Sequence, residues 1–491
     1  MYKQGHANKA AKAVFASLLA ASLVAPSGVA LAGSSTTDVA DSTFTVTGID
    51  PKDVAHAYQI FDTDIDANNN LTFISKVNGL PDAYDTAEEI SAKTDGREVA
   101  NAIASIVVQN STKTTSAVAG TDGKATLTLD SGYWLVTVTT ESGNTKVYQT
   151  MLVNATPDID DQGNYVTRVL TDAEAKSLNV PSPEKKIIDP DTQSKVDSTD
   201  GYSVGDTAQF EVIGTLPNYP ADAIHAIYAI TDVPDSGLEI DHSTLVVKNG
   251  VTTLEEGADK DYTLTWNTDG GYTVSFTKAY ILKSPGASVI INYSAKITSI
   301  NNVTGKVGNK VYGTFTPNPY DTKDVKTPET DTEDQTYGFY FLKVGADDET
   351  KGLAGAEFTV TDESGNAVTY IDAAGVLHTD GKVVSDANGY VHVNGLEAGT
   401  YHVKETGVPS GYQAIKEFDV TLSKTACTGD SAATTTVVEV NFTDEGKKVD
   451  PKIGELPSTG GAGTVALTAG GILLVVGGSA ALLANRRRNQ E

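Results

Sequence analysis

The chain has 491 residues, which is enough for about three domains of ordinary size. Its 36 Lys and Arg against 64 Asp and Glu give a formal net charge of −28, which repels nucleic-acid phosphates and excludes a nucleic-acid-binding protein. Because Cys427 is the only cysteine and the histidines lack metal-ligand spacing, we predict no disulfide, no metal site and no cofactor.

The first segment of the chain has the pattern of a secretory signal peptide. Lysines precede an apolar run at 13–25, and Ala30 and Ala32 supply the small residues that a signal-peptidase site needs. A short buried helix would not explain this order of basic, apolar and small residues. We therefore predict that residues 1–32 are removed on export and that the mature chain begins at Gly33.

Residues 33–177 form the first predicted domain. Alternating apolar and polar residues between Gly, Asn and Asp indicate short β-strands over most of it. An acidic segment at 62–68 lacks the glycine and the final glutamate of a calcium-binding loop, and we interpret it as an acidic turn. We predict one helix, with Asp95 and Glu98 as a capping pair, from apolar residues that recur at helical spacing: Val99, Ala102, Ile103, Ile106 and Val107.

Two breaks in the pattern separate three predicted domains. A Pro-containing segment at 178–184 follows the first domain, and an acidic Thr- and Pro-containing stretch at 327–336 follows the second. The second domain is accordingly predicted at 178–326 and the third at 337–446. Both consist of short runs with alternating hydrophobicity, so the middle of the chain is predicted to be mostly β.

The most specific internal motif lies in the third domain. The pattern L-x-x-G-x-Y-x-x-x-E-T-x-x-P-x-G-Y spans residues 396–412. On a strand, Tyr401, Val403 and Glu405 share one face, so an apolar face carries a carboxylate that needs a partner. This run resembles the E-box region of collagen-adhesin B-type domains in Gram-positive pilins.

The resemblance implies a covalent cross-link in this domain. In that family the glutamate catalyses condensation of a buried lysine with an asparagine into an intramolecular isopeptide bond. Glu405 is the implied catalytic acid, Lys343 the amine and Asn441, on the last strand, the acceptor. Asp444 is the alternative acceptor, because Asn441 shares its face with Glu439 rather than with the apolar residues of that strand.

The second domain carries a related set, which resembles the collagen-adhesin A-type pilin domain. Lys185 occupies that family's bonding position in the first strand, and Asp232 matches its acid in a T-D-x-x-x-x-G-L pattern at 231–238. Asn318 is the implied acceptor, with Asn309 as the alternative. Taken alone, each of these residues could be an ordinary surface lysine, solvated acid or turn asparagine. Two complete sets in the same chain order favour two bonds, formed without another enzyme.

The end of the chain, residues 456–491, resembles the cell-wall sorting signal of Gram-positive surface proteins. An apolar stretch at 465–484 is long enough for a transmembrane helix, and three arginines follow it. The resemblance implies that a sortase cleaves after the threonine of a pentapeptide and attaches the protein to peptidoglycan. A permanent membrane anchor would leave this pentapeptide unexplained: Leu456, Pro457, Ser458, Thr459 and Gly460.

Together these resemblances identify the chain as a member of the backbone subunits of sortase-assembled pili. They imply tandem immunoglobulin-like β-sandwiches and a pilin-class sortase that joins Thr459 to a lysine of an identical subunit. Tip and base pilins and a host surface ligand are the implied further partners, in support of adhesion. The family's Y-P-K signature is missing, so Lys176, just before the first domain boundary, is the predicted acceptor and Lys186 its rival. No hydrolase motif occurs, and we predict that the protein is not an enzyme.

The main alternative is a single-copy, wall-anchored adhesin. An adhesin attached alone needs a long stalk to clear the cell wall. Only residues 442–455 separate the last predicted strand from the sorting motif, a span of at most about 50 Å. The short spacer favours the polymer.

Overall fold

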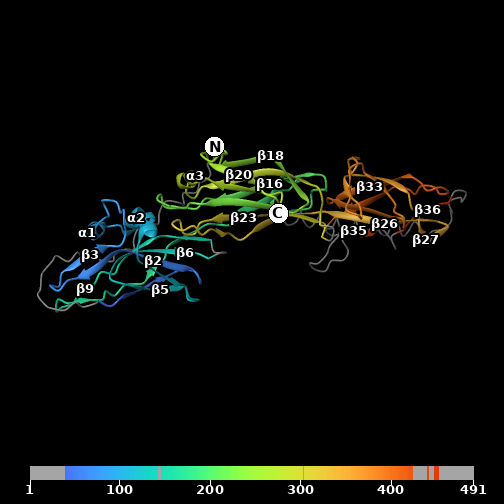
Figure 1. Ribbon diagram of the computed structural model, residues 1–491. Helices are drawn as coiled ribbons and strands as arrows, with labels where there is room; N and C mark the ends of the chain where they lie inside the picture. The colour runs from blue at the N-terminus through green and yellow to red at the C-terminus, as the bar shows by residue number, and fades with distance from the viewer. Residues whose placement is uncertain (1–38, 142–144, 302–303, 424–438, 442–446, 453–491) are drawn as a thin grey trace, which may run out of the picture.

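The computed structural model describes residues 39–141, 145–301, 304–423, 439–441 and 447–452. They form three β-rich units that follow one another along the molecule (Figure 1). The prediction of a mostly β chain is confirmed. The predicted signal peptide, sorting pentapeptide and transmembrane stretch lie outside the described residues. Within the described residues, no helix is long and apolar enough to cross a membrane.

The first unit packs two sheets and a helical layer around one central strand. The larger sheet has the order β3-β2-β6-β8, with β4 also paired to β2, and the smaller has the order β11-β1-β5. Every residue of β6 is buried, because the smaller sheet covers one face and two helices cover the other. The strands are β1 Ser42–Thr47, β2 Val54–Ile65, β3 Leu71–Ser75, β4 Thr114–Val118, β5 Lys124–Leu129, β6 Gly132–Thr139, β7 Lys146–Tyr148, β8 Met151–Asn154, β9 Asp158–Ile159, β10 Tyr165–Val166, β11 Ala173–Glu174 and β12 Ser177–Asn179.

The helical layer of this unit contains one more helix than expected. The predicted helix is present as α2 Gly96–Asn110, and the Asp95 side chain caps it by accepting from the backbone of Arg97 and Glu98. A shorter helix, α1 Ala87–Ser91, precedes it and starts with a capping box formed by Thr86 and Glu89. A further helix, α3 Lys278–Lys283, lies in the second unit.

The second unit is a sandwich of two sheets around one large core. One sheet has the order β14-β13-β16-β22-β18-β19, and the other has the order β15-β25-β23-β17-β21-β20, with β24 paired to β23. The strands are β13 Glu184–Ile188, β14 Lys195–Val196, β15 Ser198–Thr199, β16 Thr207–Thr215, β17 Tyr228–Pro234, β18 Leu238–Asn249, β19 Thr252–Thr253, β20 Tyr262–Trp266, β21 Tyr272–Phe276, β22 Ser288–Ile297, β23 Lys306–Phe315, β24 Val325–Lys326 and β25 Thr330–Gln335.

The third unit is a smaller sandwich. One sheet has the order β27-β26-β32-β29-β30, with β35 and β36 paired to β26, and the other has the order β31-β28-β33-β34. The strands are β26 Tyr337–Gly345, β27 Asp348–Gly352, β28 Glu357–Thr361, β29 Tyr370–Ile371, β30 Leu377–His378, β31 Lys382–Val384, β32 Tyr390–Leu396, β33 Gly399–Gly407, β34 Phe418–Leu422, β35 Glu439–Asn441 and β36 Lys447–Asp450.

The unit boundaries differ from the predicted ones because strands cross each proposed break. The acidic stretch at 327–336 contains β25, which pairs with β23 and β15 and so completes the second sandwich. Strand β12 pairs with β7, which extends the first unit to residue 179. Strand β36 pairs with β26, which extends the third unit to residue 450. Hydrophobicity alone did not reveal β25, since its inward residues are polar: Thr332 and Asp334.

The junction between the second and third units gathers carboxylates in a largely buried place. Asp334 is 1% exposed there, and Asp200, Asp206 and Glu397 contribute further negative charge. The units are held together by backbone hydrogen bonds, from Val204 N to Gly395 O (2.7 Å) and from Ala398 N to the Asp200 carbonyl (3.0 Å). Burial, and then the neighbouring carboxylates, raise the pKa of Asp334 well above its usual range and that of Glu397 to about 7.

The junction is therefore expected to weaken as the pH rises. The unfolded pKa of a glutamate is about 4.3, so the raised folded pKa means that the neutral form of Glu397 is favoured in the folded state. That stabilisation is present below about pH 4 and is lost as the pH passes through about 7. Thermal unfolding between about pH 5 and 8 should show this loss, and Glu397→Gln should flatten it. The exposed Glu363→Gln is the matched control. An unchanged slope in Glu397→Gln would contradict this account.

Candidate functional site

The core of the second sandwich contains a completely buried lysine. The alternation of β13 points Lys185 and Ile187 inward, and the Lys185 side chain is fully shielded from solvent. Its Nζ lies 5.4 Å from the ring centroid of Phe210 and 5.2 Å from that of Tyr293. Burial in this aromatic surrounding lowers the pKa of Lys185, and the adjacent Asp232 opposes that shift.

An acid and an amide lie beside this lysine. Asp232, on β17, is 0% exposed and contacts Lys185 Nζ directly. Asn309, on β23, is 1% exposed, and its backbone pairs with Pro234 of the strand that carries Asp232. The Tyr293 hydroxyl connects all three, because it accepts from Lys185 Nζ (2.6 Å) and Asn309 Nδ2 (2.7 Å) and donates to Asp232 Oδ2 (2.8 Å).

Asn318, the expected acceptor, is not brought to this site. Its Nδ2 donates to Thr137 (3.2 Å) and Thr139 (3.1 Å) of β6, so it joins the first unit to the second. The reason is that β23 ends at Phe315, before the chain reaches Asn318. The alternative residue, Asn309, occupies the position instead. The inward alternation of Val307, Asn309 and Val311 was the signal that could have identified it.

The third sandwich also buries a lysine against carboxylates. Lys343, on β26, has a fully shielded side chain and lies over Phe358, with its Nζ 5.8 Å from the ring centroid. Its Nζ is 3.4 Å from Glu405 Oε2 and contacts Asp450 Oδ1 directly. Glu405 Oε2 also accepts from the backbone N of Ile415 at 2.9 Å. Burial is the main cause that raises the pKa of Asp450 to about 6, and Lys343 opposes it.

The predicted acceptors of this domain are not seen at Lys343. The backbone of Asn441 pairs with Tyr340, three residues before the lysine, and its side chain lies outside the described part of the structure. Asp444 also lies outside the described residues. Asp450 was missed because the domain was predicted to end at residue 446, whereas β36 lies alongside β26 and its Asp450 pairs with Gly345.

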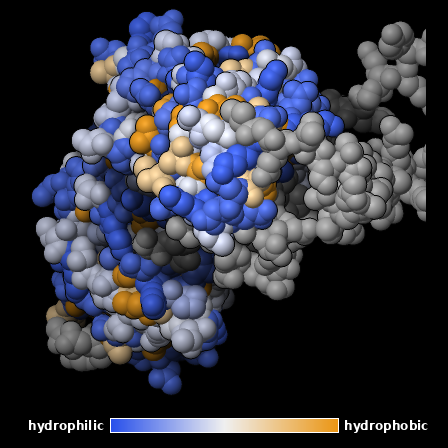
Figure 2. All heavy atoms as spheres, turned by 90° about the vertical axis from the view of Figure 1, so that its right-hand side faces the viewer, coloured by the Kyte–Doolittle hydropathy of each residue, from blue (hydrophilic) through white to orange (hydrophobic). Residues whose placement is uncertain are grey.

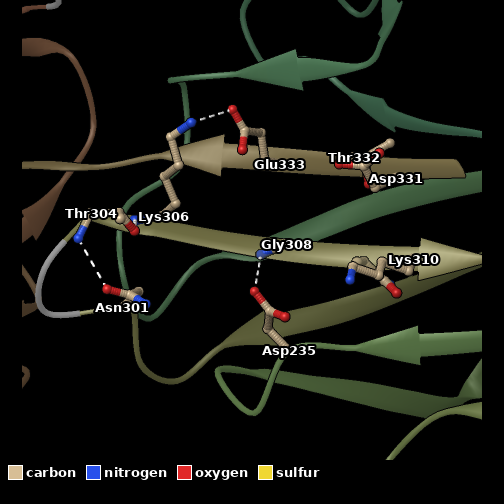
Figure 3. Close-up of a pocket in the computed structure, with 10 residues that line it drawn as sticks. Asp235, Asn301, Thr304, Lys306, Gly308, Lys310, Asp331, Thr332 and Glu333 are labelled. Atoms are coloured by element: carbon tan, nitrogen blue, oxygen red, sulfur yellow. Dashed lines mark hydrogen bonds and ion pairs between the residues drawn. The ribbon is translucent and has the colours of Figure 1, made fainter. Parts of the chain in front are cut away.

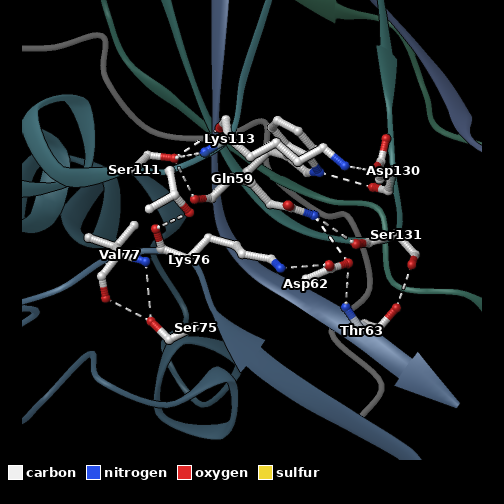
Figure 4. A network of polar contacts seen from close by, with 12 residues as sticks. Gln59, Asp62, Thr63, Ser75, Lys76, Val77, Ser111, Lys113, Asp130 and Ser131 are labelled. Carbon is white, nitrogen blue, oxygen red and sulfur yellow. Dashed lines mark hydrogen bonds and ion pairs between the residues drawn. The ribbon is translucent and has the colours of Figure 1, made fainter.

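Among its described residues, the first unit holds a polar network but no comparable buried lysine (Figure 4). Gln59 is 0% exposed and donates to the Ser131 carbonyl at 3.1 Å. Lys76 pairs with Asp62 at 3.0 Å, and Lys113 contacts Asp130. Both amines belong to side chains that keep contact with solvent, 27% and 43% exposed. We interpret the network as hydrogen bonding between strands.

The two candidate polymerisation lysines differ in their surroundings. Lys176 lies exposed between β11 and β12, and its carbonyl accepts from Gln149 N at 2.8 Å. No ion pair holds its amine within the described part of the chain. Lys186 is half-buried and pairs with Asp197 at 2.6 Å, and this hydrogen bond raises the pKa of Lys186.

The surface of the second sandwich carries a polar cavity. The cavity has a volume of about 230 Å³, lies beside β23 and β25 and is lined by polar side chains (Figure 3). Lys306 and Glu333 form an ion pair there at 2.6 Å, and Asp235 accepts a hydrogen bond from Gly308 N. Among the described residues, no group of three or more His, Cys, Asp or Glu side chains has metal-binding geometry. The end of the molecule that Figure 2 presents is mostly hydrophilic, with scattered apolar residues.

Comparison with known proteins agrees with this architecture. A model of the SpaA prealbumin-like fold domain matches residues 339–436, and a model of the LPXTG cell wall anchor motif matches residues 448–491. No curated protein matches the chain. The T6 backbone pilin of serotype M6 Streptococcus pyogenes superimposes with a TM-score of 0.61 at 20% identity, over 80% of this chain and 82% of that one.

Two further structures are similar in fold. The full-length major pilin SpaD from Corynebacterium diphtheriae gives a TM-score of 0.52 at 18% identity, over 84% of this chain and 98% of that one. The major pilin SpaA from the same organism gives 0.50 at 14% identity, over 84% and 100%. The chain shares the fold of these major pilins and carries a cell wall anchor motif. The expected resemblance to major pilins is thus confirmed.

The hydrogen bonds from Asn318 to the first unit lead to a prediction about stability. Asn318→Ala removes two hydrogen bonds between the units and leaves buried hydroxyls with one partner fewer, so the free energy of unfolding should fall by about 1–3 kcal/mol. Chemical denaturation measures this loss. The exposed Asn388→Ala serves as the control. If Asn318→Ala is as stable as that control, Asn318 does not hold the junction together.

Proposed function

We propose that the chain is a structural subunit of a covalently polymerised, wall-attached pilus. A pilin-class sortase joins Thr459 of one subunit to a lysine of the next, and tip and base pilins complete the fibre. The combination of a pilin fold with the LPXTG anchor motif carries this proposal. The protein's role is structural, and it serves the sortase as a substrate.

The distance between the last strand and the sorting motif supports the polymer over the adhesin. Strand β36 ends at Asp450, nine residues before Thr459. Nine extended residues span at most about 32 Å. The next subunit would therefore lie close to the third sandwich, whereas a solitary adhesin would need a stalk.

We propose further that Lys185 condenses with Asn309 and that Lys343 condenses with Asp450 or Asn441. A lysine amine attacks a carbonyl carbon only when it is neutral, and burial favours the neutral form. The neighbouring acids, Asp232 and Glu405, move the proton that the leaving group needs. Ammonia leaves from an asparagine and water from an aspartate, so atoms balance without an added reagent.

Such bonds would reinforce the sandwiches under tension. Lys185 lies on the first strand of the second unit and Asn309 on one of its last, and Lys343 and Asp450 bracket the third unit in the same way. Closing loops of about 100 to 130 residues removes several kcal/mol of unfolded-chain entropy, by analogy with disulfides. A pull on both ends would load the cross-link rather than the strands between.

Intact mass measures these bonds directly. Each Lys–Asn bond should lower the mass of the mature chain by about 17 Da and each Lys–Asp bond by about 18 Da, the masses of ammonia and water. Asp232→Ala should abolish only the second-domain bond, and Glu405→Ala only the third-domain bond. Asp450→Ala compared with Asn441→Ala identifies the third-domain acceptor. A parent chain of unshifted mass would exclude both bonds.

The polymerisation acceptor is tested in a strain that assembles the fibre. Lys176→Ala should collapse the high-mass ladder of a denaturing gel to monomer, because the amine that receives the Thr459 acyl group is gone. Stability should stay within about 0.5 kcal/mol, since the side chain is exposed. A ladder that persists in Lys176→Ala but is lost in Lys186→Ala would move the acceptor to Lys186. A parent strain without any ladder would favour the adhesin.

A further inference from the structure

One tyrosine hydroxyl touches every reacting group of the second sandwich. Tyr293 is 3% exposed and points inward from β22, in the same sheet as the strand of Lys185. Asp232 and Asn309 belong to the opposite sheet. The hydroxyl therefore bridges the two sheets, with the amine 2.6 Å, the amide nitrogen 2.7 Å and the carboxylate 2.8 Å from its oxygen.

Packing holds this hydroxyl in place. The Tyr293 ring stacks on Phe210 with centroids 5.3 Å apart and planes at 15°, and the edge of Tyr272 meets it at 5.3 Å and 80°. Burial, with Asp232 nearby, raises the pKa of Tyr293 well above its usual value, so the hydroxyl keeps its proton between transfers. Asn309 Oδ1 is buried without a hydrogen-bond partner among the described residues, which leaves the amide free to change its bonding.

We propose that Tyr293 is a catalytic residue that relays a proton from the lysine to the departing amide nitrogen. This role rests on the proposed Lys185–Asn309 bond. As Lys185 Nζ bonds to Asn309 Cγ, the amine passes one proton to Asp232, which it contacts directly. The Tyr293 hydroxyl turns its own proton from Asp232 to Nδ2 and takes the new proton from Asp232, the Cγ–Nδ2 bond breaks and ammonia leaves. Tyr293 and Asp232 return to the protonation states in which they began, and no other reagent is consumed.

The third sandwich supplies an internal reference. There, Lys343 Nζ contacts both Glu405 and Asp450 directly, and no tyrosine hydroxyl bonds to it among the described residues. Loss of the Tyr293 hydroxyl should therefore slow one bond and leave the other unchanged.

The test is Tyr293→Phe, which keeps the ring and removes the relay. The full mature chain is made by cell-free synthesis, sampled over time and digested, and the linked peptides of each domain are quantified by mass spectrometry. The second-domain linkage should form at least tenfold more slowly, while the third-domain linkage keeps the parent rate. Tyr228→Phe is the matched control, because Tyr228 is 0% exposed in the same core and its hydroxyl bonds to none of the three reacting groups.

A second variant distinguishes loss of the proton relay from a folding defect. Replacement of Tyr293 by 3-fluorotyrosine retains the hydroxyl and acidifies it, so the second-domain rate should change, whereas the same replacement of Tyr228 should not alter it. Parent-like rates in a folded Tyr293→Phe chain, or in the fluorinated chain, would overturn the relay and leave the bond intact. A parent chain without the Lys185–Asn309 peptide would overturn the bond and the relay together.

Discussion

The structure depends above all on lysine amines buried in apolar cores. Lys185 and Lys343 are completely shielded from solvent, and an ammonium left unpaired in such a place costs several kcal/mol. Each sandwich meets this constraint with carboxylates. Asp232 and Glu405 lie on the sheet opposite their lysine, and Asp450 lies on the strand beside Lys343. In the third unit this contact depends on strand pairing, since Asp450 reaches Lys343 only because β36 lies beside β26. A group that is costly as a charge is well suited to react as a neutral amine.

The junctions between units use polar contacts rather than a shared apolar core alone. Asn318 links the second unit to β6 of the first through two threonines, and carboxylates gather where the second unit meets the third. Strand β25 joins the second and third units, because it completes the second sandwich and is followed directly by β26 of the third. The chain therefore passes from one sandwich to the next without a free linker at 327–336, as the proposed fibre subunit would need in order to transmit tension.

In the proposed fibre, the cross-links and the chain path would act together. The two buried lysines stand near the start of their units, and the proposed acceptors stand near the ends. Force entering at one end of a sandwich would then leave at the other through the cross-link. The first unit differs, since Lys76 and Lys113 pair at the surface and its strands are held by hydrogen bonds and helix packing. With both proposed cross-links formed, it would be the unit most open to local unfolding.

The sequence by itself determined the β-rich class, helix α2 with its Asp95 cap, and the inward face that carries Glu405. These features follow from local periodicity, which a strand or helix cannot violate without exposing its apolar face. Lys185, Asp232 and Lys343 were selected by the resemblance to pilin domains. The tertiary structure alone decided that Asn309 rather than Asn318 lies at Lys185, that Asp450 lies at Lys343, and that β25 belongs to a sheet. Each of these depends on where a strand ends and on its register against a partner far away in the chain. Local pattern does not encode that register, because strands of similar alternation fit a sheet equally well until the buried polar groups select one pairing.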